Sequence, residues 1–106
     1  MHAHDRIRLR HMLEAAEEAL LIADHRSRIT LLAVMKDIEI IGEAASRISP
    51  ELRAAEPDLP WVDIIGMRNR LIHAYFDVKA AVIWETVERD LPVLVQQLRA
   101  ILATPA

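Results

Sequence analysis

Apolar residues recur every three or four positions along four long segments of the chain, and this spacing constrains the fold more than any other feature. Such spacing places apolar side chains on one face of a helix, whereas a half-buried strand requires strict alternation. With two glycines and 4% aromatic residues, the apolar content is mainly aliphatic residues and alanine, which suit packed helices. The sequence therefore predicts an all-α fold.

The periodic segments define the predicted helices. These cover residues 5–24, 27–48 (beginning at Ser27 or Thr30), 60–73 and 80–102, with a short turn or helix from Ser49-Pro50. Asp5 is the predicted N-cap of the first helix, and Asp77 of the last. Because the apolar phase continues beyond Pro92, we expect a kink there rather than a break.

The length of 106 residues predicts a single domain, residues 1–106. No apolar run approaches the roughly 18 residues that a membrane-spanning helix needs, and residues 1–6 lack the apolar core of a secretory signal. We therefore expect a soluble, cytoplasmic protein that makes no membrane contact. The absence of cysteine excludes a disulfide and a thiol nucleophile.

The formal net charge of −3 argues against a general nucleic-acid coat protein, because nonspecific affinity depends on many Lys and Arg side chains. Any nucleic-acid site must therefore be local. The basic clusters that can form one are Arg6, Arg8, Arg10 and His11, then Arg26 and Arg28, and finally Arg68 with Arg70. Solvated surface charge is the alternative for each cluster. We predict no metal site, because His2 and His4 fall in a chain end that is expected to fray.

The second predicted helix has more apolar surface than one core contact requires. Gly42 and Ala45 in its main stripe predict the close approach of a neighbouring helix. Four further residues widen the apolar face, and we expect another helix or another subunit to cover them: Leu32, Ala33, Ile40 and Ala44. Together with the apolar surface of the 60–73 helix, this excess predicts a homodimer.

Arg68 occupies an unusual position in the third long helix. At about 100° per residue it falls in line with Leu71 and Tyr75, which places a guanidinium among apolar residues. A charge in that setting requires a partner. The partner is either an internal carboxylate such as Glu43 or a bound phosphate, which the planar guanidinium can hold with two parallel hydrogen bonds.

Asn69 and His73 lie four residues apart and share a helix face with Gly66. The missing side chain of Gly66 leaves room for a ligand or a second backbone. A histidine near a helix end can simply bond a terminal carbonyl. Its ordinary pKa near 6.5 also lets it exchange protons at neutral pH, as RNA cleavage through the 2′-hydroxyl requires. Taken alone, Tyr75 is expected to be a half-buried aromatic residue.

The spacing Arg68-x4-His73-x-Tyr75 resembles the signature of the HepT-like toxins in the HEPN superfamily. The surrounding sequence is also similar to that family, so the resemblance covers nearly the whole chain. The similar stretches are residues 37–44, Pro60-Trp61, residues 66–73, Trp84 and residues 90–92. The resemblance implies a four- to five-helix HEPN bundle that is up-and-down and dimeric.

The resemblance further implies a metal-independent endoribonuclease that needs no cofactor and acts in a cleft at the dimer interface. Arg68 would bind and polarise the scissile phosphate, His73 would act as acid or base, and Asn69 would orient the site. The dimer would supply two copies of the single histidine. Further RNA contacts are expected from the basic clusters, at Arg70, Arg26 and Arg28.

The resemblance also implies a partner, because related toxins are paired with a minimal nucleotidyltransferase antitoxin that adenylylates the motif tyrosine. That residue is Tyr75 here, and its adenylylation would inhibit the toxin. One alternative is a noncatalytic HEPN module that binds a nucleotide or the nucleotidyltransferase, and another is a plain dimeric bundle used for assembly. The polar set on a packing face favours the enzyme.

Overall fold

The computed structural model describes residues 1–105 of the chain, and it confirms the all-α prediction: no strand occurs in that range. The helices are α1 (Ala3–Ile22), α2 (Arg28–Ser46), α3 (Pro50–Ala55), α4 (Trp61–Ala74), α5 (Ala80–Glu85) and α6 (Leu91–Leu102). A 3-10 turn, η1 (Tyr75–Asp77), follows α4, and a π-helical segment, η2 (Thr86–Asp90), joins α5 to α6.

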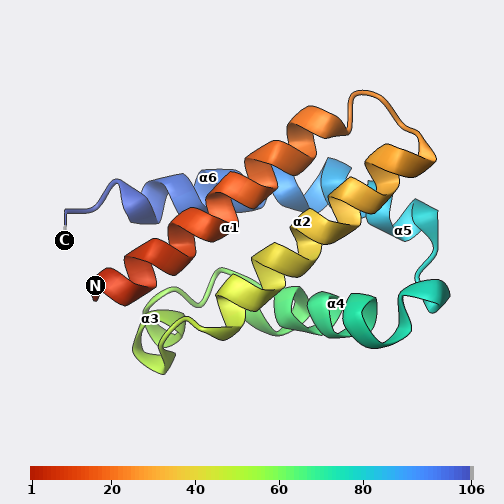
Figure 1. Ribbon diagram of the computed structural model, residues 1–106. Helices are drawn as coiled ribbons and strands as arrows, with labels where there is room; N and C mark the ends of the chain where they lie inside the picture. Colours follow the sequence, from red (N-terminus) through yellow and green to blue (C-terminus); the bar gives the residue numbers. More distant parts are fainter. Residues whose placement is uncertain (106) are drawn as a thin grey trace.

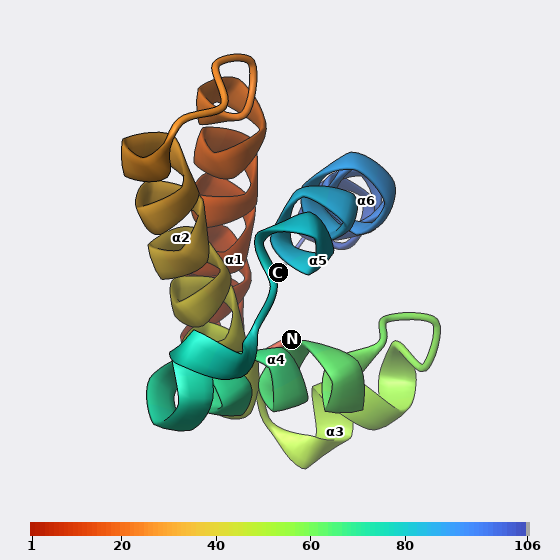
Figure 2. The same ribbon diagram turned by 90° about the vertical axis from the view of Figure 1, so that its right-hand side faces the viewer.

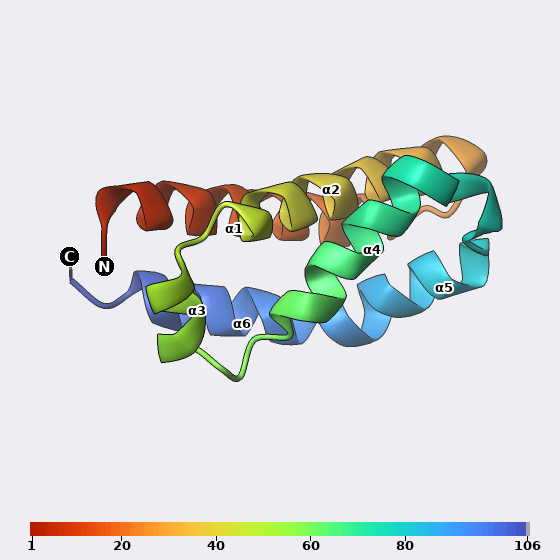
Figure 3. The same cartoon turned by 90° about the horizontal axis from the view of Figure 1, so that it is seen from below.

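The long helices alternate in direction, which confirms the predicted up-and-down bundle (Figure 1). α1 and α2 form an antiparallel pair, α4 runs back along α2, and α5–α6 returns antiparallel to α1 (Figure 3). α2 packs against both α1 and α4, and α1 also packs against α6. Viewed along the bundle, α4 lies below the α1–α2 pair, with α5–α6 to one side (Figure 2).

The core is made of aliphatic side chains from several helices, as the periodicity predicts. Fully inaccessible residues come from α1, α2, α5 and α6, and they include Leu9, Met12, Val34, Ile83 and Leu98. α4 contributes fewer buried residues, chiefly Trp61 and Leu71. None of the helices within residues 1–105 has the length and apolar character that crossing a membrane demands.

The prediction that Asp5 is the N-cap of the first helix is wrong, because α1 already begins at Ala3. Asp5 lies buried inside the first turn, where its carboxylate accepts hydrogen bonds from the backbone N–H of Ser49 at 2.9 Å and from the Ser49 hydroxyl at 2.5 Å. Burial raises the pKa of Asp5, but the two hydrogen bonds, together with the nearby His4 and His2, outweigh that effect and lower the pKa. Asp5 thus ties α1 to the N-cap of α3.

The other predicted helix ends have mixed outcomes. Ser27 is the N-cap of α2 and forms a reciprocal capping box with Thr30. Of the two predicted starts of this helix, Ser27 is therefore confirmed. Asp77 does not cap the last helix, because α5 starts three residues later, after Lys79, and has no side-chain cap.

Pro92 distorts the last helix without breaking it, as predicted. The proline has no N–H to donate, and its ring crowds the carbonyl one turn earlier, at Glu88. That carbonyl lies in η2, where a π-helical turn from Thr86 to Asp90 replaces regular α-helical bonding. The helical path then continues to Leu102.

Candidate functional site

The motif residues come from one helix and the turn that follows it. Arg68, Asn69, Arg70 and His73 lie on α4, and Tyr75 opens η1. Gly42 on α2 sets the position of Arg68, because a Cβ added to this glycine would lie 2.1 Å from the Cβ of Arg68 and 3.0 Å from a carbonyl oxygen of α4. The close helix approach predicted at Gly42 is therefore confirmed.

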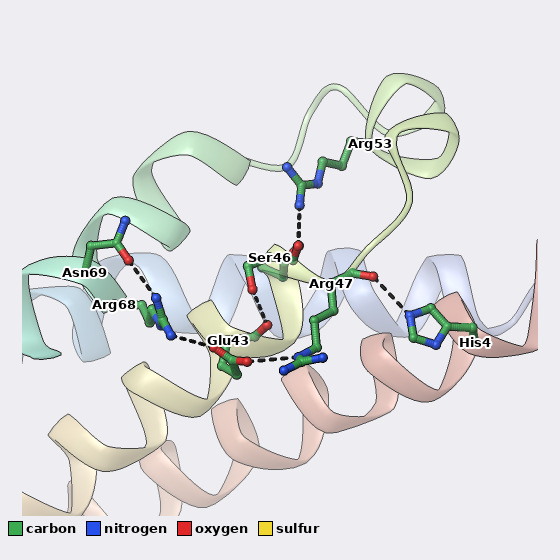
Figure 4. Close-up of polar contacts among 8 residues, drawn as sticks. His4, Glu43, Ser46, Arg47, Arg53, Arg68 and Asn69 are labelled. Carbon is green, nitrogen blue, oxygen red and sulfur yellow. Dashed lines mark hydrogen bonds and ion pairs between the residues drawn. The ribbon is translucent and has the colours of Figure 1, made fainter.

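The guanidinium of Arg68 is held between a carboxylate and an amide (Figure 4). One terminal nitrogen donates to Glu43 Oε2 at 2.7 Å, and the other donates to Asn69 Oδ1 at 2.8 Å. Glu43 also accepts from Arg47 Nε at 2.9 Å. That hydrogen bond and the positive charge of Arg68 lower the pKa of Glu43 against a smaller opposing effect of burial, so Glu43 stays ionised at neutral pH. The predicted carboxylate partner of Arg68 is thus confirmed as Glu43.

His73 and Tyr75 differ from Arg68 in that they face solvent. His73 is exposed, and Tyr75 is 60% exposed rather than half-buried. The Tyr75 ring meets the ring of Phe76 edge to face, with 6.0 Å between the centroids. No hydrogen bond to the imidazole or the phenol occurs among residues 1–105. Both groups are therefore free to meet a ligand.

A single chain does not bring Arg68 and His73 onto one face. Five positions on an α-helix turn the side chain by roughly 140° relative to the first. Arg68 faces α2, whereas His73 lies on the side of α4 that carries Gly66, where an added Cβ would have no neighbour within 4 Å. The open space predicted beside Gly66 is present. A ligand or second backbone in that space stays a prediction.

The other predicted RNA contacts are Arg70, Arg26 and Arg28. Arg70 and Arg28 are exposed. Arg26 forms an ion pair with Glu88 and lies over the ring of Trp84, 4.9 Å from its centroid, so it fixes the α1–α2 connection to α5 and η2. An RNA contact by any of the three remains a prediction.

The histidines near the start of the chain are candidate metal ligands. Nε2 of His4 lies 3.1 Å from the carbonyl oxygen of Arg47, which is a hydrogen bond (Figure 4). Within the described part of the chain, no three His, Asp or Glu side chains are grouped closely enough to hold a metal ion.

Two pockets flank the contact between α2 and α4. The larger, of about 400 Å³, lies between α2, α4 and α6, has a mainly apolar lining and includes none of the motif residues. The other, of about 290 Å³, lies between α1, α2 and α4 and is lined in part by Arg68. Arg8 and His11 of the first basic cluster also line it, together with Lys36. Periodicity within one helix does not predict that these residues meet Arg68.

Substituting Gly42 with alanine is expected to destabilise the protein by about 1–3 kcal/mol, because the new methyl group would overlap Arg68 and force the helices apart. Gly66→Ala is the matched control, since it adds the same group to a helix with open space around it. That control should leave stability unchanged or raise it by up to about 1 kcal/mol. Urea denaturation of both variants measures the difference. Equal stability of the two variants would contradict the packing described at Gly42.

Comparison with known proteins relates most of the chain to one family. A family model described as "Ribonuclease HepT-like" matches residues 7–101. The chain is 43% identical over 70 residues to a protein of Caldanaerobacter subterraneus subsp. tengcongensis named "Putative RNase TTE0752", covering 66% of this chain and 62% of the relative. It is 45% identical over 65 residues to "Probable ribonuclease HepT" of Thermococcus cleftensis, covering 61% and 59%.

A third relative, from Methanocaldococcus jannaschii and named "Putative RNase MJ1380", is 36% identical over 69 residues, covering 65% of this chain and 63% of the relative. The matched segments thus span less than two thirds of the length of these curated relatives. No solved structure matches the chain.

Proposed function

The chain belongs to the HepT-like ribonuclease family, and on that premise we propose that it is a metal-independent endoribonuclease whose active site is a cleft between two copies of the chain. One observation carries the proposal: the Arg68-x4-His73-x-Tyr75 set lies on α4 and η1 with its imidazole and phenol exposed. The family match supports it, since it spans residues 7–101 and includes the whole motif.

The proposed reaction uses only groups of RNA and of the protein. The 2′-oxygen of RNA attacks the adjacent phosphorus, a bond from phosphorus to O2′ forms, and the bond from phosphorus to O5′ breaks. One imidazole takes the proton of the 2′-hydroxyl, and another donates a proton to the leaving O5′. Arg68 holds the phosphate oxygens, where charge builds up in the transition state. The products are a 2′,3′-cyclic phosphate and a 5′-hydroxyl.

Two copies of the chain resolve a geometric difficulty in this reaction. Arg68 and His73 lie on different faces of α4, and one histidine cannot serve as base and acid at the same time. Apolar side chains that remain exposed on α2 and α4 support a homodimer: Leu32 is 49% exposed, Ile40 38% and Ile72 43%. Ala44, which was also expected to need cover, is already buried within the chain.

A toxin of this kind requires a means of control, and we assign that role to Tyr75. The proposed partner is a minimal nucleotidyltransferase antitoxin that transfers AMP to the phenolic oxygen, with pyrophosphate leaving. The exposure of the phenol supports this assignment, because a buried hydroxyl would be closed to another enzyme.

A noncatalytic module that binds a nucleotide or the nucleotidyltransferase is the second candidate, and one observation favours it. Both terminal nitrogens of Arg68 already have acceptors, on Glu43 and Asn69. These contacts already use two of the five N–H groups of the guanidinium, which leaves fewer donors for a phosphate. A noncatalytic module does not require Arg68 to bind a scissile phosphate.

Cleavage of RNA at different protein concentrations, in excess chelator, tests the proposed function. We expect sedimentation equilibrium to show a dimer at micromolar concentration. Activity per chain should decline on dilution below the dimer dissociation constant, and the new RNA ends should be 2′,3′-cyclic phosphates. Loss of cleavage in chelator, or constant activity per chain in a protein that sediments only as a monomer, would contradict the proposal. A dimer that leaves RNA intact would favour the noncatalytic module.

A further inference from the structure

The pocket between α1, α2 and α4 combines charged groups from three helices. Its volume is about 290 Å³. The charged and titratable residues in its lining are Arg8 and His11 from α1, Lys36, Glu39 and Glu43 from α2, and Arg68 from α4.

Two arginines at this pocket have an Nε atom without an acceptor in the described part of the chain. Nε of Arg8 and Nε of Arg68 are both shielded from solvent, and neither has a hydrogen-bond partner among residues 1–105. Arg8 and Lys36 also form no ion pair with the carboxylates described there. Arg8 is partly buried, and a partly buried cation is normally paired. Lys36 is exposed and lines the same pocket. The pocket therefore has positive charge that an anion can neutralise.

The charge balance of the pocket also favours an anion. Arg8, Lys36 and Arg68 carry three permanent positive charges, against the carboxylates of Glu39 and Glu43. Arg68 and Glu43 form an ion pair with each other, which leaves Arg8 and Lys36 against Glu39.

We propose that this pocket is a second phosphate-binding subsite, in which Arg8, His11 and Lys36 bind a phosphodiester of the RNA strand beside the one that Arg68 holds. The inference rests on the proposed function, because it takes RNA as the ligand. Ile40 and Ile72 also line the pocket. RNA would then be bound by α1 as well as by the motif helix.

Glu39 allows a test in which RNA binding should change in the opposite direction. Its carboxylate lines the same pocket, so it opposes the binding of a phosphate. Removing a cation from this pocket should therefore weaken RNA binding, and removing this carboxylate should strengthen it.

The experiment measures the affinity of a labelled RNA oligonucleotide for the His73→Ala protein, in which cleavage is expected to be slow, over a series of salt concentrations. Each lost phosphate contact should lower the slope of log affinity against log salt by about 0.7 for a single-stranded RNA and weaken binding about fivefold at about 0.1 M salt. We expect this effect from Arg8→Gln and from Lys36→Gln, and tighter binding from Glu39→Gln.

The matched control is Arg10→Gln, which removes the same charge from the same helix. Arg10 lines a different pocket, with Glu14, Glu17 and Arg99, so its loss should leave the salt slope unchanged. If Arg8→Gln fails to fold, Arg8→Lys keeps the charge and should keep the slope, whereas Lys36→Gln should still lower it. Slopes for Arg8→Gln and Lys36→Gln equal to that of Arg10→Gln would overturn the inference.

The subsite and the proposed function can fail separately. If the wild-type protein cuts RNA and the Arg8→Gln and Arg10→Gln variants bind RNA equally well, the subsite is contradicted and the proposed function is not. If the protein never cuts RNA but its variants show the predicted salt slopes for RNA binding, the nuclease proposal is contradicted and the subsite is not. Inorganic phosphate that displaces the RNA at micromolar concentration would overturn the assignment to an RNA phosphodiester in favour of a free anion.

Discussion

Replacing His73 with alanine is expected to slow RNA cleavage by about 10²- to 10⁴-fold, the usual contribution of a positioned acid or base. The fold should survive, because His73 is exposed in the last turn of α4 and has no hydrogen-bond partner in the described part of the chain. Rates of cleavage in excess chelator measure the effect, with thermal unfolding as the test of folding.

His25→Ala is the matched control for that variant. His25 is also exposed, but it lies in the connection between α1 and α2 and belongs to no part of the motif. Its substitution should leave the rate within about twofold of wild type, since surface changes away from a site have small effects. A folded His73→Ala protein that cuts RNA as fast as the His25→Ala protein would remove His73 from the mechanism.

Addition of AMP to Tyr75 is expected to reduce cleavage to background. The phosphodiester so formed is an anion two residues beyond His73, where it can pair with Arg68 or Arg70 and compete with the phosphate of RNA. Its nucleotide would also block access for RNA. Coexpression with the nucleotidyltransferase, followed by intact-mass measurement and a cleavage assay, tests both effects.

Tyr75→Phe supplies the control for the modification, because it removes the phenolic oxygen and keeps the ring that meets Phe76. This variant should gain no mass of AMP, and it should remain active in the presence of the nucleotidyltransferase. AMP found on the Tyr75→Phe protein would place the modification on another residue.

The contact between α2 and α4 could be predicted from the sequence because single residue types determine it. A glycine in an apolar stripe allows close helix approach, and Gly42 provides it for Arg68. An arginine on a packing face requires an acceptor, and Glu43 was the carboxylate predicted to supply it. Both inferences follow from steric and electrostatic requirements that hold within one pair of helices.

Features that depend on contacts between distant segments could not be predicted in this way. Asp5 looked like a helix cap because local sequence favours that role, whereas its donors come from Ser49, far along the chain. The pocket that joins Arg8, Lys36 and Arg68 depends on how three helices cross, which periodicity does not specify. The spacing of Lys36, Ile40 and Glu43 does place them on one face of α2, and that signal could have linked the pocket to the motif.

The central claim is that Arg68 binds the phosphate of RNA and does not serve only to hold Glu43, and two substitutions test it directly. Arg68→Gln and Arg47→Gln each remove one of the two arginines that donate to Glu43. If Arg68 binds the scissile phosphate, Arg68→Gln should lower the cleavage rate by at least about 10²-fold, and Arg47→Gln should leave it nearly unchanged. Equal rates for the two folded variants would contradict the claim.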